Sequence, residues 1–352
     1  DALLAVSGYA ERDGNVCYLC GHKNAFPYSG RSGIISGLGY SALLIPAEGQ
    51  TTLISPLGYR PDLVVGVDNA KTGRNFSQEL VSAVRESRLD RRKIGLAGSD
   101  IIPVAYITEL SRAFPELSLQ FADELVAEQR MIKSENELRI LRQASRVADK
   151  AVEAAVDSIK PAMTESAIGS AARKAAMEAG ADYVVRDRIQ SGSELGTLRW
   201  PFASQRKVRK GELVSIDFVG WVNAYGFDIL RMACVGRPNK GQRVLVETAG
   251  EATKAMTDVL SDRRQIEYSI AQLKKFEKVG VRVEPFGHAI GLEIVENPYL
   301  LPEASGIVKK NMVFCVEPTV KSPKGWASIE NEVIVTDTKP EVLTKLPVDL
   351  WR

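Results

Sequence analysis

Two strand-like segments that carry a carboxylate among apolar residues constrain this chain most. Asp217 lies inside "LVSIDFVG", and Asp228 opens "DILRMACVG". Two further acids have similar surroundings, since Glu317 ends "MVFCVE" and Glu330 begins "ENEVIVT". Removing such a carboxylate from water is unfavourable unless it is paired or binds a cation. One acid of this kind fits an ion pair, but several in one part of the chain favour a shared cation.

The histidine content narrows the chemistry of that cation site. The chain has 2 histidines, His22 and His288, and His288 lies within "EPFGHAIGLEIVENP". Carboxylates combined with one imidazole suit Mn²⁺, Fe²⁺, Co²⁺ or Zn²⁺. The alternative for His288 is a core histidine with satisfied hydrogen bonds. Because the candidate carboxylates accompany it, the sequence favours a metal ligand.

Residues 1–125 alternate between short strand and helix patterns. Apolar, β-rich runs occur at "NVCYLC", "YSALLIP", "TTLIS" and "KIGLAG", and helical patterns at "FSQELVSAVRES" and "VAYITELSRAF". This alternation predicts a small α/β domain. Cys17 and Cys20 form a C-x-x-C, which is typical of redox sites and zinc half-sites. Because no second such pair follows, we interpret "NVCYLC" as a buried strand instead.

A helix start marks the second domain. Ser134 followed by Glu137 forms a capping box, and apolar residues at helical spacing continue until Pro161 ends the pattern. We expect a second helix at about 164–179, ended by Gly180. Further helical patterns, over 240–261 and 265–278, lie between β-rich segments. The predicted domains are 1–127 and 128–352.

The composition excludes several classes of partner. A net charge of +2 gives no electrostatic reason to expect nucleic acid. No apolar run approaches the roughly 20 residues that span a bilayer, and "DALLAVSGYAERD" lacks the regions of a signal peptide. The 4 cysteines fit a reducing compartment. We therefore expect a cytoplasmic protein without membrane or nucleic-acid partners.

The carboxylate segments together resemble the pita-bread metallohydrolases, the superfamily of aminopeptidase P, prolidase, creatinase and methionine aminopeptidase. "GELVSIDFVGWVNAYGFDILRMACVG" is similar to their D-x10-D strand pair, and "FGHAIGLEIVENP" to their G-H-x-x-G-L segment. "MVFCVEPTV" resembles V-x-x-x-E-P, and "SIENEVIVTDTKPEVLT" resembles I-E-D-x-V-x-V-T. "EQRMIKSENELRILRQA" is similar to the aminopeptidase P, prolidase and creatinase branch. The resemblance implies an α/β (α+β) chain, with a small creatinase-like N-terminal domain and a C-terminal pita-bread catalytic domain.

The resemblance also implies a metal centre of two ions, with Mn²⁺ favoured over Fe²⁺, Co²⁺ or Zn²⁺. Two divalent ions offset four carboxylates, and a bridging water loses a proton near neutral pH and becomes the nucleophile. This branch further implies a homodimer. Position by position, one ion is held by Asp217, the other by His288 and Glu317, and both by the bridging ligands Asp228 and Glu330.

Three histidines that the peptidases of this branch use around the metals are replaced. The matching positions are Trp200, Glu284 and Val295. Trp200 offers an apolar wall with one N–H donor, and Val295 offers only packing. Glu284 is a general base, a partner for a substrate ammonium group, or a salt-bridged surface residue. The missing histidines predict a substrate other than an ordinary Xaa-Pro peptide.

Other polar residues are candidates for the substrate pocket. Arg199 and Tyr225 flank the metal segments and are assigned to a substrate carboxylate or aromatic ring. Arg231 holds the family's D-x-x-R position, where a structural role behind the ligands competes with substrate binding. Glu317 and Glu284 are candidates for proton transfer. Asn331 stands where the family usually has Asp, which predicts altered tuning of the ligands without loss of metal.

The resulting expectation is a metal-dependent hydrolase of a small, carboxylate-bearing, non-peptide substrate. It cleaves a C–N bond of amide or amidine type through a metal-bridged hydroxide. A lyase of the dimethylsulfoniopropionate-lyase type is the first alternative, and Glu284 or Glu296 would supply its base. An atypical Xaa-Pro peptidase is the second. A non-catalytic binding scaffold is the third, and five intact ligand positions argue against it.

Overall fold

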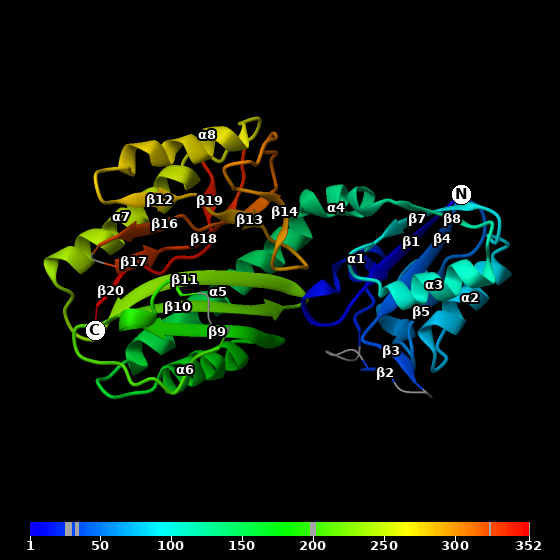
Figure 1. The fold of residues 1–352 in the computed structure, drawn as a ribbon, viewed down its shortest axis with the longest axis horizontal. Helices are drawn as coiled ribbons and strands as arrows, with labels where there is room; N and C mark the ends of the chain where they lie inside the picture. The colour runs from blue at the N-terminus through cyan, green and yellow to red at the C-terminus, as the bar shows by residue number, and fades with distance from the viewer. Residues whose placement is uncertain (25–29, 32–34, 198–201, 324, 352) are drawn as a thin grey trace. The chain divides into compact units, whose positions relative to one another are not determined.

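The computed structural model of the chain describes residues 1–24, 30–31, 35–197, 202–323 and 325–351. The chain forms two compact units, Asp1–Arg130 and Met131–Arg352. Each unit combines helices with sheets (Figure 1). The expected boundary between residues 127 and 128 falls inside helix α4, Asp123–Met131. The mixed architecture confirms the expected α/β (α+β) class. No helix within the described ranges is long and apolar enough to cross a bilayer.

The smaller unit is built on one six-stranded sheet. Its strands are β1 Ala2–Ser7, β4 Ser41–Pro46, β5 Thr52–Ile54, β6 Asn69–Lys71, β7 Lys93–Ala97 and β8 Ser118–Phe121, with β2 Gly30–Arg31 and β3 Ser36–Leu38 as a separate pair. Its helices are α1 Gly14–Cys20, α2 Phe76–Glu86 and α3 Val104–Ala113, with short 3-10 turns at Ala10–Arg12 and Pro61–Leu63. The sheet order is β6-β5-β4-β1-β7-β8. Apolar side chains of β1, β4 and β7 pack against α2 and α3 to form its main core.

One predicted strand of the smaller unit is wrong, because "NVCYLC" forms helix α1. Val16 and Cys20 lie one turn apart and are both buried, and the Cys20 thiol donates to the Val16 carbonyl oxygen at 3.3 Å. Gly21 follows the helix with a φ of 79°, which favours glycine. A short apolar run fits a strand or a helix, and here this buried pair belongs to a helix. Burial raises the pKa of the Cys17 thiol to about 12, so it is no ready thiolate.

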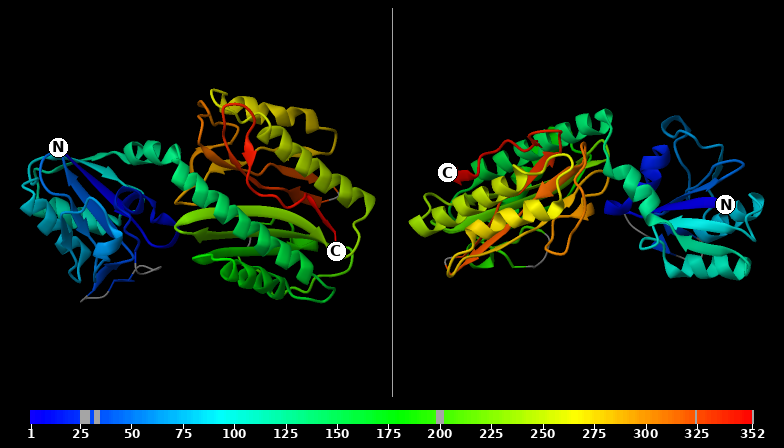
Figure 2. Two further views of the ribbon diagram at one scale, coloured as in Figure 1. Left: turned by 180° about the vertical axis from the view of Figure 1, so that it is seen from behind. Right: turned by 90° about the horizontal axis from the view of Figure 1, so that it is seen from above.

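The larger unit begins with two helices that cover one face of a four-stranded sheet (Figure 2). The helices are α5 Glu135–Ser158 and α6 Glu165–Glu178, and the sheet, in the order β20-β11-β10-β9, contains β9 Tyr183–Ser191, β10 Leu213–Val222, β11 Tyr225–Cys234 and β20 Asp349–Trp351. The predicted capping box of α5 is confirmed, since Ser134 and Glu137 exchange hydrogen bonds between side chain and backbone. Apolar residues of both helices and of β10 and β11 form one core.

The rest of the larger unit combines two small sheets with α7 Lys240–Thr257 and α8 Ile266–Ala271. The predicted helix over 240–261 therefore ends earlier, and a 3-10 turn at Gln272–Phe276 follows α8. A further 3-10 turn spans Gly192–Glu194. The sheets have the orders β12-β16-β17 and β14-β13-β15-β18-β19. Their strands are β12 Arg282–Glu284, β13 Gly287–Ala289, β14 Glu296–Tyr299, β15 Val313–Val316, β16 Thr319–Ser322, β17 Gly325–Ser328, β18 Asn331–Ile334 and β19 Glu341–Val342.

Candidate metal centre

Two arginines and two aspartates face one another across three neighbouring strands. β10 pairs with β9 and β11 so that Arg188 lies opposite Asp217, and Val219 lies between Arg186 and Asp228. Side chains alternate along a strand, and residues in register point to the same face. All four charged side chains therefore lie on one face of the sheet.

Short ion pairs join these four groups. Arg186 donates from Nη2 to Asp228 Oδ2 at 2.8 Å, and its Nε lies 3.1 Å from Asp217 Oδ1. Arg188 donates to Asp217 Oδ2 from Nε at 2.8 Å and also from Nη2. Burial lowers the pKa of Arg186, but the charges of Asp228 and Asp217 outweigh this effect and raise it above its ordinary value. The guanidinium groups therefore offset the charge of two buried carboxylates.

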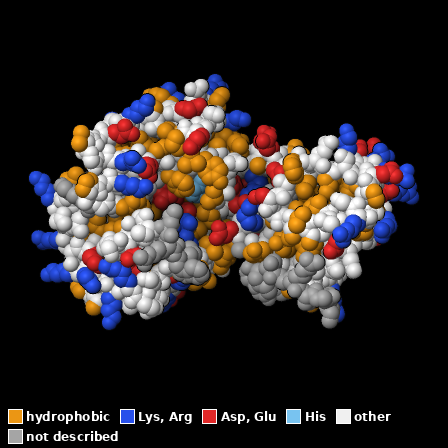
Figure 3. Space-filling view, viewed as in Figure 1, with side chains coloured by type: hydrophobic (Ala, Val, Ile, Leu, Met, Phe, Trp, Pro, Cys, Tyr) orange, Lys and Arg blue, Asp and Glu red, His pale blue; other side chains and the backbone are white. Residues whose placement is uncertain are grey.

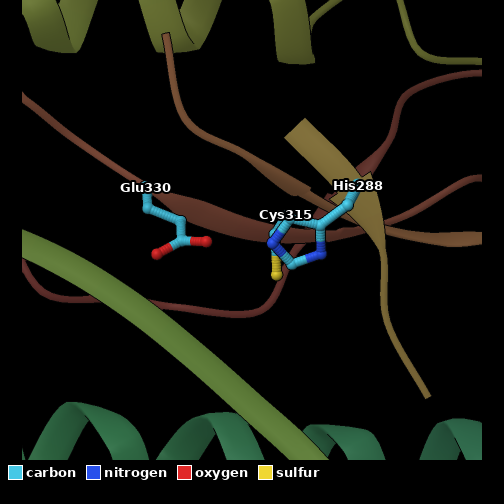
Figure 4. A group of neighbouring side chains, drawn as sticks. All are labelled: His288, Cys315 and Glu330. Carbon is cyan, nitrogen blue, oxygen red and sulfur yellow. The ribbon is translucent and has the colours of Figure 1, made fainter. Parts of the chain in front are cut away.

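His288, Cys315 and Glu330 form a second group beside the aspartates. Their candidate ligand atoms all lie within 4.8 Å of one another, and Figure 4 shows the imidazole beside the thiol, with the carboxylate turned toward them. His288 Nε2 lies 3.9 Å from Asp228 Oδ2, which links the two groups. His288 Nδ1 lies 3.1 Å from the Ala289 carbonyl oxygen. When Nδ1 carries the proton it donates to that oxygen, and the lone pair of Nε2 is left for a metal.

Glu317 adds a fourth carboxylate to this region. It follows β15, and its backbone N–H donates to the Phe286 carbonyl oxygen at 3.0 Å. Burial, together with the charges of Asp217 and Asp228, raises the pKa of its carboxyl to about 8. Burial also raises the pKa of Asp228 and of Glu330, and nearby carboxylates add to it. Full ionisation of the group is unfavourable unless a cation compensates it.

Buried carboxylate oxygens without a hydrogen-bond donor indicate that this group fits a cation. Asp217 Oδ1, Asp228 Oδ1 and Glu330 Oε1 accept no hydrogen bond from any residue that the structure describes, and such orphaned oxygens are unfavourable without a partner. Asp217 Oδ1 has Arg186 Nε at ion-pair distance, 3.1 Å away, which leaves Asp228 Oδ1 and Glu330 Oε1. Together with His288 and Glu317 they form a donor set that suits a divalent ion such as Mn²⁺. The surroundings of Asp217 differ, because each of its oxygens has a guanidinium nitrogen within 3.1 Å.

Buried hydrogen bonds fix the strands behind the ligands. Glu332 on β18 accepts the backbone N–H of Asp228 at 2.7 Å and the hydroxyl of Ser145 on α5. Burial raises the pKa of the Glu332 carboxyl to about 8. The contacts of Glu332 thus tie α5 and β18 to the start of the strand that carries Asp228.

Arg231 also lies behind the ligands. Its guanidinium group donates to the Leu346 carbonyl oxygen at 3.2 Å, to the Glu330 carbonyl oxygen, and to Asn331 Oδ1 at 2.9 Å. Burial lowers its pKa to about 10. Of the two alternatives for Arg231, these contacts match the structural role rather than substrate binding. They also make Asn331 a hydrogen-bond acceptor beside Glu330.

The other predicted pocket residues are placed as follows. The Tyr225 hydroxyl donates to Glu137 Oε1 at 3.0 Å. Glu284 Oε2 accepts from Lys321 Nζ at 2.6 Å, and its side chain is 41% exposed. Of the three roles considered for Glu284, these contacts match the salt-bridged surface residue. Glu296, a candidate base of the lyase alternative, forms a buried ion pair with Lys133 at 3.1 Å. Val295 is exposed. Arg199 and Trp200 lie outside the described residues.

The surface of the larger unit is hollowed where charged groups gather. Figure 3 shows acidic, basic and histidine atoms in this hollow, with hydrophobic side chains around them. Arg186 and Arg188 keep 29% and 22% of their side chains exposed, whereas the aspartates they contact are almost fully buried. The two arginines are thus more accessible than the aspartates that they contact.

The fold and this acid-rich site together define a metallohydrolase of the pita-bread class. The chain belongs to metallopeptidase family M24, whose sequence profile matches residues 139–337, and the metallopeptidases of this family act with divalent metals. It is similar to the Xaa-Pro dipeptidase of Pyrococcus furiosus, with 30% identity over 234 residues, 65% of this chain and 67% of that protein. The Xaa-Pro dipeptidase of Pyrococcus horikoshii is 28% identical over 265 residues, 74% of this chain and 75% of that protein.

Solved structures confirm the expected fold. The X-Pro aminopeptidase from Thermotoga maritima MSB8 has a TM-score of 0.81 and 22% identity, and the match covers 100% of this chain and 97% of that one. The prolidase from Pyrococcus horikoshii OT3 has a TM-score of 0.82 and 24% identity, over 99% of this chain and 94% of that one. The family match and the dipeptidase relatives confirm the recognition of the pita-bread superfamily from the carboxylate segments, and the solved structures confirm its fold.

Several residues of the site were not predicted. Arg186 and Arg188 stand in "YVVRDRIQS", where alternating charges are readable as one face of a strand. Cys315 lies two residues before Glu317, so strand alternation was again the available signal. For Glu332 no such signal exists, because its partners come from distant parts of the chain.

Proposed function

We propose that this metallohydrolase cleaves a C–N bond in a small, carboxylate-bearing substrate that is not an ordinary Xaa-Pro peptide. One observation carries the proposal: His288 is the only histidine in residues 131–352. The larger unit therefore has no histidine besides the proposed ligand to bind a substrate carbonyl or to transfer a proton. At two of the positions matched to the missing histidines, Glu284 is paired with Lys321 and Val295 is apolar.

The residues of the site divide the chemical work among them. A divalent ion, when bound, polarises the substrate and lowers the pKa of a coordinated water. His288, Glu317, Glu330 and Asp228 would hold it. Glu317 also stays our candidate for proton transfer, because a carboxylate beside the ion can accept a proton from a coordinated water.

The two arginines support the choice of an anionic substrate. Arg186 and Arg188 carry positive charge at the exposed edge of the acidic group, and such a charge attracts carboxylates toward the site. They also hold Asp217 in one orientation. That the ion is Mn²⁺, that the chain forms a homodimer and that it acts in the cytoplasm stay predictions.

A panel of paired substrates tests the proposal. Small N-acyl, guanidino and cyclic amidine acids are each assayed with Mn²⁺ beside their methyl esters and beside Xaa-Pro dipeptides. We expect at least one acid to be turned over roughly tenfold or more faster than its ester, as one lost charge-assisted contact predicts. In H₂¹⁸O, hydrolysis places the label in the product, whereas elimination does not. Unlabelled product contradicts a hydrolase, and equal turnover of acids and esters contradicts the carboxylate.

Xaa-Pro dipeptide hydrolysis is the second candidate function. It is favoured by the names of two relatives with 28% and 30% identity. The same panel separates the two candidates. If Xaa-Pro dipeptides are turned over more efficiently than every small acid, the argument from the missing histidines is refuted.

A further inference from the structure

We infer that this chain binds one divalent ion, and that the guanidinium groups of Arg186 and Arg188 stand in for the second ion of a dinuclear centre. The inference concerns the number of ions and is independent of the substrate. The family resemblance implies two ions, one of them held by Asp217 together with the bridging ligands Asp228 and Glu330. The arginines on β9 are the residues that this expectation did not include.

The arginines contact the carboxylate of Asp217, which was expected to bind a metal. Arg186 Nε faces Asp217 Oδ1 at 3.1 Å, and Arg188 donates to Oδ2 from two nitrogens. Each oxygen thus has a guanidinium nitrogen within 3.1 Å, as an ion pair without a hydrogen bond at Oδ1 and with hydrogen bonds at Oδ2, and Asp217 is 2% exposed. A metal at this position would have to displace two cations that are already in contact with the same carboxylate.

Asp228 divides its two oxygens between an arginine and the remaining ion. Its Oδ2 accepts from Arg186 at 2.8 Å, whereas its Oδ1 accepts no hydrogen bond from a described residue. Glu330 Oε1 is likewise buried without a donor. The imidazole of His288 lies beside them, with Nε2 3.9 Å from Asp228 Oδ2. Asp217 Oδ1 also lacks a hydrogen bond, but Arg186 Nε lies 3.1 Å from it. The ion is therefore placed next to His288, at Asp228 Oδ1 and Glu330 Oε1.

The charges of the group agree with a single ion. Asp217, Asp228, Glu317 and Glu330 contribute four negative charges when ionised, and the two arginines contribute two positive ones. One divalent ion neutralises the remainder, whereas a second would leave two excess positive charges beside carboxylates that are almost fully buried. The arginines thus make a second ion electrostatically unfavourable, and their guanidinium groups also occupy its position beside Asp217.

Metal content and spectroscopy test the inference without an activity assay. The purified full chain is loaded with Mn²⁺, desalted and analysed by elemental mass spectrometry and by electron paramagnetic resonance. We expect one ion per chain and the six-line signal of an isolated Mn²⁺. Two ions per chain with the coupled signal of a Mn²⁺ pair, or no bound ion, would overturn the inference.

Four variants locate the ion. Asp217→Asn is expected to keep one ion, since Asp217 is not a ligand here, and Glu330→Gln is expected to lose it. Arg186→Met/Arg188→Met is expected to gain a second ion. Arg173→Met is the matched control, because Arg173 pairs with Asp187 on the other face of β9 at 2.7 Å, and it should keep one ion.

Two results would contradict this assignment. Loss of the ion in Asp217→Asn would make Asp217 a ligand after all. A double arginine variant that stays folded, by tryptophan fluorescence, and still binds a single ion would show that the arginines do not exclude the second one. If the double variant does not fold, the wild-type stoichiometry and Asp217→Asn still decide the question.

Discussion

Replacement of Lys133 by Met is expected to destabilise the larger unit by about 3–5 kcal/mol, as for other buried ion pairs that lose one partner. Lys133 Nζ lies 3.1 Å from Glu296 Oε2, and the two side chains are 1% and 8% exposed. At this distance, and with an effective dielectric constant of about 20, two unit charges attract each other by about 5 kcal/mol. Met retains the apolar stem of lysine, so the main loss is the charge that compensates buried Glu296.

Tryptophan fluorescence during urea unfolding measures this effect selectively. A double-mutant cycle with Lys133→Met, Glu296→Gln and both changes isolates the interaction of the pair. We expect the double variant to be more stable than Lys133→Met, because it leaves no buried charge without a partner. The probes all belong to the larger unit: Trp200, Trp221, Trp326 and Trp351.

Two outcomes refute this reasoning about the ion pair. If Lys133→Met lowers the free energy of unfolding by less than about 1 kcal/mol, the pair contributes only as much as an exposed ion pair. That result would contradict the burial of the Lys133–Glu296 pair. Simple additivity of the two single changes would show that Lys133 and Glu296 do not interact.

Substitutions elsewhere test single residues. Burial lowers the pKa of His22 to about 4 from 6.5, so the unfolded chain binds more protons between these values. The free energy of unfolding of the smaller unit should fall by about 1.4 kcal/mol per pH unit as the pH drops through this window. Measured by hydrogen exchange, this dependence on pH should be weaker for His22→Gln, and equal dependence in both proteins would contradict the expectation. Arg231→Lys should cost the larger unit about 2–4 kcal/mol in the fluorescence assay, whereas a pure change in KM would indicate substrate contact. Glu284→Gln should change kcat/KM by less than about twofold, as for a surface salt bridge with Lys321, and a larger loss would make Glu284 the base.

The fold was largely readable from the sequence because its signals are local. The capping box at Ser134 and the helix that follows depend on spacing within a few turns. The strands around Asp217 and Asp228 stand out because carboxylates among apolar residues are rare in the absence of a partner. "NVCYLC" misled because a short apolar run has too few residues to show a period, and its helix is fixed by burial of Val16 and Cys20.

The site was harder to read, because its decisive contacts join distant segments. The Arg188 side chain meets Asp217 only through the register of β9 and β10. The Lys133 side chain meets Glu296 across more than half of the larger unit's sequence. The spacing of the sequence motifs identified the candidate ligands. It did not show that Arg186 and Arg188 contact two of them, Asp217 and Asp228. The assignment of the individual ligands stays a prediction.

The most direct test of the single-ion centre is a crystal structure of the Mn²⁺-loaded chain, with anomalous differences measured at the manganese edge. We predict one anomalous peak, bound by His288 Nε2 and by oxygens of Asp228, Glu317 and Glu330, while Arg188 stays on Asp217. Two peaks, with Asp217 bound to one of them and the arginines turned away, would contradict this account.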